Sequence, residues 1–506
     1  MGQTMVVRAF KFNGNTLLSS EELSQVLVPL LDHPIDFSRV QSSAVMVADL
    51  YRDKGWVVQT LVPAQDITNG EVTIEIVEAV FGQVQFTGAS ATRVAPEAVR
   101  SIFERQQQSG QFLNMNAVDR ALLLADDLPG VTVSGNLAPG QRSTQTDLFL
   151  TMSDEPVLAG TASIDNTGAV STGASRANLG LSLNSPLGRG DYLSVSAMNA
   201  RGTNYARMAY SVPLGSDGWR MGVNASHLGY VLISEAYASL DAKGSSTTKG
   251  LELSYPLVRS RSFNLSSSLT ADKKEYLNVS GGATTSEYNN IPLTLSLNAS
   301  GFDALGGGGA NALSLSLTDG RLNLDGSPTQ ATDASTSQTA GGYSKVRYAV
   351  SRQQQIDTGT TLYVALSGQW ANKNLDSSEK FYLGGSSGVR AYPSSEGGGT
   401  LGHMLNMELR WQLPDGFNLV GFYDYGAVTQ NTLNDFTGAS ALNSFGLQGV
   451  GLSLAWRAGI GLNLQATYAR RIGENPNAIS TEFNRGADQD GTFTRDRLWI
   501  TASLAF

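Results

Sequence analysis

This sequence of 506 residues has no cysteine, lacks long apolar runs, and only 16% of its residues are charged. The absence of cysteine excludes a disulfide framework and thiolate zinc sites. No stretch approaches the roughly 20 unbroken apolar residues that a membrane-spanning helix needs, so we do not expect a helical membrane protein. The net charge of −9 argues against a nucleic-acid partner, because phosphate binding needs an excess of basic residues.

Glycine is abundant, with 55 residues, while the apolar fraction is 41% and the mean hydropathy is −0.13. A transmembrane β-strand is apolar only on its lipid-facing side, so apolar and polar residues alternate along it. The mean hydropathy of such a strand is therefore modest. Alternation of this kind fills the sequence from Val157 onward. The second part of the chain, residues 154–506, is therefore predicted to be an all-β transmembrane barrel.

Sixteen antiparallel strands are predicted in this barrel. Connections after even-numbered strands are short and rich in turn residues, as at 185–188, 213–215, 255–257 and 413–416, whereas 318–342 and 471–492 are long and polar. Short turns on one side and long loops on the other are typical of outer-membrane barrels. The predicted strands lie near 158–166, 176–184, 191–200, 205–212, 219–230, 249–255, 263–278, 288–300, 308–317, 343–353, 360–372, 401–412, 417–428, 447–456, 462–470 and 493–506.

The first 150 or so residues instead combine helical periods with short strands, in two α+β repeats at 1–78 and 79–153. Each repeat is predicted to run strand, helix, helix, strand, strand, and to bury one stripe of each helix against a small sheet. Gly55 is expected to end a helix, because glycine readily adopts the left-handed conformation of a C-cap. The predicted elements are Met5 to Phe12, a helix from Ser19/Ser20 with Glu21/Glu22, Phe37 to Lys54, Trp56 to Val62, Val72 to Val77, Phe81 to Phe86, Ala95 to Gln107, Met115 to Leu128, Val131 to Leu137 and Asp147 to Met152.

A Gly-rich loop at about 373–400, between the eleventh and twelfth strands, contains Val389, Arg390, Ala391 and Tyr392. Because barrel interiors are polar, we expect this loop to fold inward and to pair its guanidinium with a carboxylate of the wall. No catalytic or metal-binding residues are predicted. Residues 384–388 fit the G-x-S-x-G pattern of hydrolases, but no helix follows, and the three histidines have no ligand-like spacing.

The wall carboxylate is expected on the thirteenth strand, in Phe422-Tyr423-Asp424-Tyr425-Gly426. Period-2 geometry places Phe422 and Asp424 on one face, toward the lumen. If the twelfth and thirteenth strands pair symmetrically about Asp415, Glu408 lies opposite Phe422 and about 7 Å along the strand from Asp424. The guanidinium of Arg390 would then reach Asp424, with Glu408 as a second acceptor.

Several motifs resemble those of two-partner secretion transporters. The segments Tyr51 to Trp56 and Val84 to Gly88 are similar to POTRA domains, which lie in the periplasm. Residues 389–392 resemble the V-R-G-Y tip of the sixth outer loop, here called loop 6, with Ala391 replacing the glycine. The segment from Phe422 to Gly426 resembles the F-x-D-x-G wall motif, and the terminal Phe506, on an apolar face with 498, 500, 502 and 504, resembles the signal read by the barrel-assembly machinery.

This resemblance implies a protein of the bacterial outer membrane that needs no cofactor and contacts the barrel-assembly machinery and membrane lipid. Its POTRA domains would capture an unfolded exported partner, a large β-helical adhesin, haemolysin or contact toxin, and the barrel would carry that partner to the cell surface. Three alternatives remain open: a barrel-assembly factor of the same superfamily, which typically has three or more POTRA repeats, a passive porin, and an autotransporter-type adhesin or barrel enzyme, which would need a passenger region or a catalytic constellation. A porin would need no POTRA pair.

The start of the sequence carries no visible signal peptide, since residues 1–4 run directly into the first predicted strand. If the protein is exported, we expect its targeting segment to have been removed. The resembling transporters usually begin with a plug helix and a linker, which we expect to have been removed or never to have been present.

Overall fold

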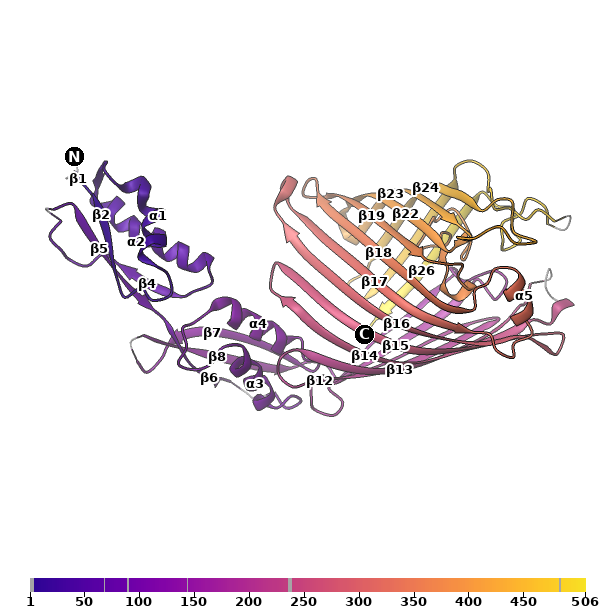
Figure 1. The fold of residues 1–506 in the computed structure, drawn as a ribbon, viewed down its shortest axis with the longest axis horizontal. Coiled ribbons are helices and arrows are strands. Elements are labelled where there is room, and N and C mark those ends of the chain that lie inside the picture. The colour runs from indigo at the N-terminus through magenta and orange to yellow at the C-terminus, as the bar shows by residue number, and fades with distance from the viewer. Residues whose placement is uncertain (1–3, 68, 89–90, 143, 235–238, 482–483) are drawn as a thin grey trace. The chain divides into compact units, whose positions relative to one another are not determined.

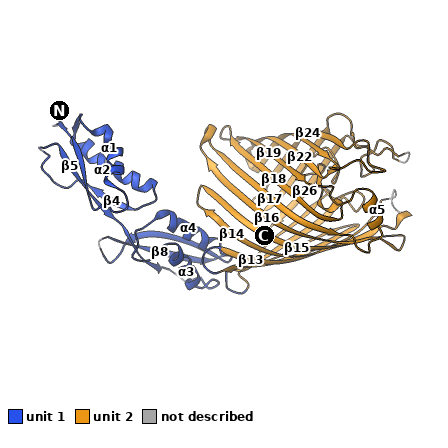
Figure 2. Ribbon diagram, viewed as in Figure 1, with its two compact units in different colours: residues 1–155, 187–190, 215–218 blue, residues 156–186, 191–214, 219–506 orange. Residues whose placement is uncertain are grey.

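The computed structural model of the chain describes residues 4–67, 69–88, 91–142, 144–234, 239–481 and 484–506 (Figure 1). The first three residues, where the sequence was expected to lead straight into a strand, therefore lie outside it. Two compact units make up the chain (Figure 2). Unit 1 contains residues 1–155 together with the turns 187–190 and 215–218, and unit 2 contains the remainder.

The first half of unit 1 has a sheet with the strand order β2-β5-β4, in which β2 and β5 are parallel. A capping box of Ser19 and Glu22 begins helix α1, as the sequence predicted, and Gly55 follows helix α2 with φ +84°. Both helices bury apolar side chains in one core with the sheet. The elements are β2 (Ala9–Asn13), α1 (Ser20–Leu27), η1 (Val28–Leu30), α2 (Phe37–Asp53), β4 (Val58–Leu61) and β5 (Glu71–Glu78).

The predicted single strand from Met5 to Phe12 is wrong, because two strands share this segment. Strand β1 (Thr4–Val6) pairs with β3 (Pro34–Asp36), whereas β2 pairs with β5. Between them, the carbonyl of Val7 accepts a hydrogen bond from Asp32, and the N–H of Arg8 donates to Gly70. These partners lie on different segments, so the ladder cannot continue through Val7 and Arg8.

Glu78, the last residue of β5, is a buried carboxylate that ties together three parts of this domain. It accepts hydrogen bonds from the N–H groups of Thr16 and Leu17, from the Thr16 hydroxyl, and from the Tyr51 hydroxyl at 2.9 Å. Burial acts to raise the pKa of Glu78, but these hydrogen bonds outweigh it and hold the pKa below its usual value. Burial, and then the bond to Glu78, raises the pKa of Tyr51.

The second half of unit 1 repeats this arrangement with its own core. Its sheet has the order β6-β8-β7, again with a parallel and an antiparallel pair. None of the helices in the described part of the chain is long and apolar enough to cross a membrane. The elements are β6 (Val80–Phe86), α3 (Pro96–Gln106), α4 (Met115–Asp126), β7 (Val131–Pro139) and β8 (Gln145–Asp154).

Unit 2 is a closed barrel in which, over the described residues, sixteen antiparallel strands pair in a ring. The predicted class, α+β repeats followed by an all-β barrel, is therefore confirmed. Each strand falls where the alternation predicted one, with shifted ends. The strands are β9 (Leu158–Asp165), β10 (Arg176–Asn184), β11 (Tyr192–Ala200), β12 (Thr203–Leu214), β13 (Trp219–Val231), β14 (Lys243–Arg259), β15 (Phe263–Ser280), β16 (Ala283–Asp303), β17 (Gly309–Asn323), β18 (Gly341–Gln355), β19 (Thr360–Ala371), β22 (Leu401–Gln412), β23 (Phe417–Thr429), β24 (Ser444–Arg457), β25 (Leu462–Arg471) and β26 (Asp496–Ala505).

Two connections differ from the prediction. The expected turn at 255–257 lies inside β14, where the register shifts between Pro256 and Val258. Such a bulge tolerates a proline, which has no N–H to donate to the ladder. The expected loop at 318–342 begins later, because β17 continues to Asn323, and it contains the short helix α5 (Gln330–Ser335).

Loop 6 joins β19 to β22 through residues 372–400 and contains η4 (Ser377–Glu379), β20 (Phe381–Tyr382) and β21 (Gly398–Gly399). Its residues contact strands from β15 around to β26. A loop that touches strands on many sides of a closed ring lies inside that ring. An apolar cluster that includes Leu383, Val389 and Tyr392 packs the loop against β23, β24 and β25.

Candidate functional site

The tip of loop 6 is a tight turn built by its own backbone. The N–H of Tyr392 donates to the carbonyl of Val389 at 3.0 Å, and the N–H of Val389 donates to Leu383 at 2.7 Å. Val389, Ala391 and Tyr392 are fully buried. The backbone therefore fixes the direction in which Arg390, between these residues, extends its side chain.

Arg390 meets Asp424 through both its backbone and its side chain. Its N–H donates to Oδ2 at 3.0 Å, Nε donates to Oδ2 at 2.8 Å, and Nη2 donates to Oδ1 at 2.7 Å. The two guanidinium bonds form the bidentate arrangement that is strongest for an arginine–carboxylate pair. Asp424 has no exposed surface, and the side chain of Arg390 is 12% exposed.

The register of the wall explains how Asp424 comes to face the loop. Strands β22 and β23 pair symmetrically about Asp415, so Glu408 lies opposite Phe422, as the sequence predicted. Alternate residues of β23 from Phe422 to Val428 are buried toward the loop. Asn406, the partner of Asp424 in the ladder, donates its side-chain amide to Asp424 Oδ1 at 2.8 Å.

Glu408 is the second carboxylate at the guanidinium. Its Oε1 accepts a hydrogen bond from Arg390 Nη1 at 2.8 Å, and its Oε2 accepts one from Arg410 Nε, also at 2.8 Å. The guanidinium carbon of Arg390 lies 3.5 Å from the centre of the Phe422 ring, close enough for a cation–π contact. The network therefore consists of the carboxylates of Asp424 and Glu408, the guanidinium groups of Arg390 and Arg410, and the ring of Phe422.

Small residues in the wall admit the tip of the loop. A Cβ at Gly426 would lie 2.7 Å from Leu383 Cδ2 and 3.3 Å from Val389 Cγ2. A Cβ at Gly449 of β24 would lie 2.5 Å from the methyl group of Ala391. Ala391, which stands where the resembled V-R-G-Y tip has a glycine, therefore fits because its methyl group faces Gly449.

Three contacts of the tip were not predicted from the sequence. Trp499 of β26 donates its indole N–H to the carbonyl of Arg390 at 2.8 Å, and the guanidinium of Arg471 lies 4.3 Å from the centre of the Tyr392 ring. The third contact is made by Asn406, whose side-chain amide donates to the carbonyl of Gly388 in the loop at 3.2 Å. The alternation of β26 and β22 contained a signal for Trp499 and Asn406, because it placed both opposite the apolar faces of their strands.

The return limb of loop 6 contacts the connection between β25 and β26. Glu396 is fully buried and accepts hydrogen bonds from Asn477 Nδ2 at 2.7 Å and from the N–H of Gln489 at 2.9 Å. In the same connection, Asp488 pairs with Arg471 and Arg497. No sequence motif marked these residues.

Phe506 lies at the seam where the barrel closes. Its N–H donates to the carbonyl of Gly160 at 3.0 Å, and its carbonyl accepts a hydrogen bond from the N–H of Gly160 at 2.7 Å, so the pairing of β26 with β9 continues to the last residue. A Cβ at Gly160 would lie 2.4 Å from the Phe506 ring, which is 59% exposed. The aromatic side chain therefore covers a glycine at the seam.

Two family models match the chain. The haemolysin secretion/activation protein family ShlB/FhaC/HecB matches residues 144–454, and the ShlB-type POTRA domain matches residues 5–79. The first match covers more than half of the chain, including loop 6 and most of the barrel.

Similar proteins and structures agree with these matches. The heme/hemopexin transporter protein HuxB of Haemophilus influenzae (strain 86-028NP) is 25% identical over 468 residues, covering 91% of this chain and 82% of HuxB. The outer membrane transporter CdiB of Dickeya dadantii (strain 3937) is 22% identical over 472 residues, covering 90% of this chain and 81% of CdiB. The structure of CdiB from Escherichia coli superposes with a TM-score of 0.76 at 19% identity, covering 100% of this chain and 91% of that one. At this identity the likeness shows the fold.

Proposed function

The chain belongs to the ShlB/FhaC/HecB family of haemolysin secretion/activation proteins, and from that membership we propose that its POTRA domains capture an unfolded exported partner and its barrel carries that partner to the cell surface. The family members to which it is similar are two-partner secretion transporters of the outer membrane, with POTRA domains in the periplasm. We place the two POTRA domains at 1–78 and 79–153 and the barrel at 154–506.

The observation that carries this proposal is the bidentate contact of Arg390 with Asp424 inside the barrel. A loop held by buried charges restricts the lumen at rest, and it can be released without breaking the barrel because ion pairs and single hydrogen bonds, rather than strand pairing, hold its tip to the wall. Removing Arg390 would leave the buried Asp424 carboxylate without its cation, and removing Asp424 would leave Arg390 with Glu408 as its one carboxylate. Val389, Arg390, Ala391 and Tyr392 are proposed as the loop 6 lock, with Asp424, Glu408, Phe422 and Gly426 as its wall.

The edge strands of unit 1 support a way of binding the partner. Strands β4 and β7 each lie at the edge of their sheet, and β7 spans nine residues. An extended peptide can add a strand at such an edge through main-chain hydrogen bonds, without a fixed sequence. This suits a partner that arrives unfolded and becomes a large β-helical protein outside the cell.

Two further partners are proposed from the barrel. Phe506 at the seam is proposed as the signal for the barrel-assembly machinery, and the outward apolar side chains are proposed to contact outer-membrane lipid. The channel is proposed to need no cofactor, with folding of the partner outside the cell providing the direction of transport.

The barrel-assembly factor is disfavoured by the family match, because residues 144–454 fit the haemolysin secretion/activation family. A passive porin is disfavoured by the two βααββ domains of unit 1 and by the charged contacts of loop 6. Neither alternative predicts that release of a particular exported protein depends on this chain.

The test is secretion of the large exported protein expected to be encoded beside this chain. We expect that protein at the cell surface when it is co-expressed with the full chain, and in the periplasm when residues 5–152 are deleted. The fragment 5–152 should be soluble and bind the N-terminal region of the partner. Secretion at the full level by the deleted chain, with equal barrel abundance, would contradict the proposal.

A further inference from the structure

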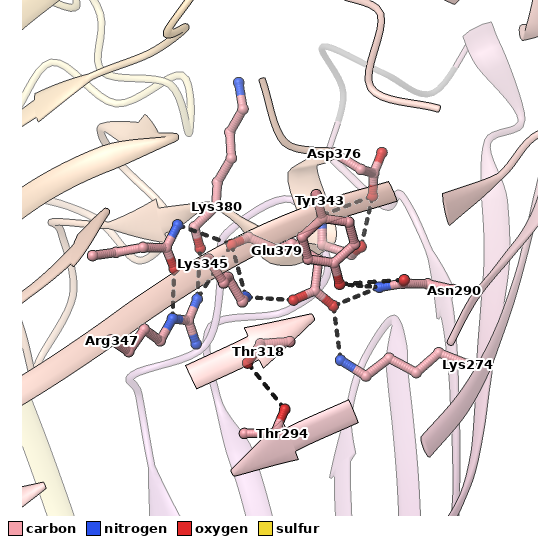
Figure 3. Close-up of polar contacts among 12 residues, drawn as sticks. Lys274, Asn290, Thr294, Thr318, Tyr343, Lys345, Arg347, Asp376, Glu379 and Lys380 are labelled. Atoms are coloured by element: carbon pink, nitrogen blue, oxygen red, sulfur yellow. Dashed lines mark hydrogen bonds and ion pairs between the residues drawn. The ribbon is translucent and has the colours of Figure 1, made fainter. Parts of the chain in front are cut away.

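Loop 6 carries another buried carboxylate, Glu379, whose partners differ from those of Arg390. Glu379 ends η4 on the limb that enters the lumen from β19, and it is 4% exposed. Its Oε1 accepts hydrogen bonds from Lys274 Nζ at 2.8 Å and from Asn290 Nδ2 at 2.8 Å, and its Oε2 accepts one from Lys345 Nζ. Figure 3 shows the carboxylate between the two lysines.

The donors to Glu379 come from neighbouring strands of the wall. Lys274 of β15 is the ladder partner of Asn290 of β16, and Lys345 lies on β18. Asn290 is held in turn by Tyr343, whose hydroxyl accepts a hydrogen bond from the Asn290 amide at 2.9 Å (Figure 3). The carboxylate therefore enters a site of two ammonium groups and an oriented amide.

The backbone of the same limb is held as well. The carbonyl of Glu379 accepts hydrogen bonds from Lys345 Nζ at 3.2 Å and from Gln369 Nε2 at 3.1 Å, and the carbonyl of Lys380 accepts one from Arg347 Nη2, also at 3.1 Å. Gln369 also donates to the carbonyl of Thr400 at 3.0 Å, on the returning limb. Several independent donors therefore fix the position of Glu379.

Arg390 and Glu379 have charges of opposite sign and pair with different strands. Arg390 brings a cation to carboxylates on β22 and β23, whereas Glu379 brings a carboxylate to ammonium groups on β15 and β18. Neither charge can leave its site without exposing uncompensated partners there. Because they share no wall strand, loss of one pair does not remove any partner of the other.

We propose that Glu379 is a positioning residue that holds the entering limb of loop 6 on β15, β16 and β18, independently of Arg390. Glu379 and Arg390 then anchor the entering limb and the tip separately, and each of these two parts can be released while the other stays in place. The inference goes beyond the proposed function, because it concerns how the loop is attached and needs no partner protein to be tested.

The natural absence of cysteine allows single reporters to be introduced. Leu375→Cys reports on the entering limb and Val389→Cys on the tip, since both side chains are buried, at 2% and 0% exposure. The full-length protein in outer membranes is treated with a membrane-impermeant maleimide. Glu379→Gln leaves two ammonium groups without their carboxylate, so we expect about tenfold faster labelling at position 375 and an unchanged rate at position 389. Arg390→Ala should produce the reverse pattern.

Glu275→Gln is the matched control, because Glu275 on β15 forms an exposed pair with Lys273 and should change neither rate. Adding Lys345→Met to Glu379→Gln removes one stranded ammonium group and should return part of the protection at position 375. If Glu379→Gln does not insert as a heat-modifiable barrel, the experiment is repeated with Glu379→Asp, which keeps the charge but has a shorter side chain. We again expect faster labelling at position 375 and an unchanged rate at position 389. Equal changes at both reporters, or no change at position 375, would overturn the proposal.

Discussion

The methyl group of Ala391 occupies space that Gly449 leaves open in strand β24, where a Cβ at position 449 would lie 2.5 Å from it. The distance is far shorter than any ordinary contact between carbon atoms. The space between the loop tip and strand β24 therefore holds one methyl group, at position 391 or at position 449, and in this chain Ala391 supplies it.

Gly449→Ala should consequently displace the tip of the loop. Overpacking by one methyl group typically costs about 1–3 kcal/mol, so we expect reduced secretion and faster cysteine labelling at position 389. Ala391→Gly in the same chain removes the shortest contact and leaves the Arg470 carbonyl at 3.2 Å as the next, so it should restore most of both. Gly459→Ala is the control, because a Cβ there meets no atom within 4 Å. A double variant as impaired as Gly449→Ala would show that the two residues do not compete.

Glu408→Gln should weaken the lock less than Asp424→Asn does. Glu408 accepts one hydrogen bond from Arg390, whereas Asp424 accepts three, one of them from the backbone. The asparagine side chain has the same shape as aspartate, but its NH2 group is a hydrogen-bond donor. It would face the N–H donors of Arg390 and Asn406, which now bind the carboxylate. Secretion measured at equal surface abundance ranks the two variants, and an equal or larger loss with Glu408→Gln contradicts this assignment.

In unit 1, Glu78→Gln should destabilise the first domain by about 2 kcal/mol near neutral pH, because hydrogen bonds to a charged acceptor are lost. The pKa of Glu78 is lowered in the folded domain, so its contribution is fully present above the usual glutamate pKa of about 4.3. It disappears as the pH falls through the lower folded value. Urea unfolding of residues 4–155 at several pH values should therefore show a difference between the two proteins that shrinks in acid. A difference independent of pH would mean that the charge of Glu78 does not matter.

Residues with a local or periodic signal could be predicted. The pairing of β22 with β23 follows from a short turn at Asp415 and from period-2 alternation, so the sequence places Glu408 opposite Phe422. The cap at Ser19 and the left-handed Gly55 follow from the same kind of local rule.

Contacts between distant segments could not be predicted in this way. Glu379 and Lys274 are 105 residues apart and lie in no motif, and only the closed ring brings their segments together. The division of residues 5–12 between two sheets depends on partners at Asp32 and Gly70, which alternation does not reveal. The inward position of Trp499 had a signal in the alternation, but its hydrogen bond to Arg390 required the folded loop.

The measurement that tests the account most directly is secretion of the partner by Arg390→Ala, Asp424→Ala and the double variant, at equal barrel abundance on the cell surface. Breaking a buried ion pair costs about 3–5 kcal/mol, so each single variant should lose most secretion while still inserting as a barrel. If both act through one contact, the double variant should be little worse than either. Wild-type secretion by Arg390→Ala, or losses that simply add in the double variant, would show that this contact does not hold the loop for transport.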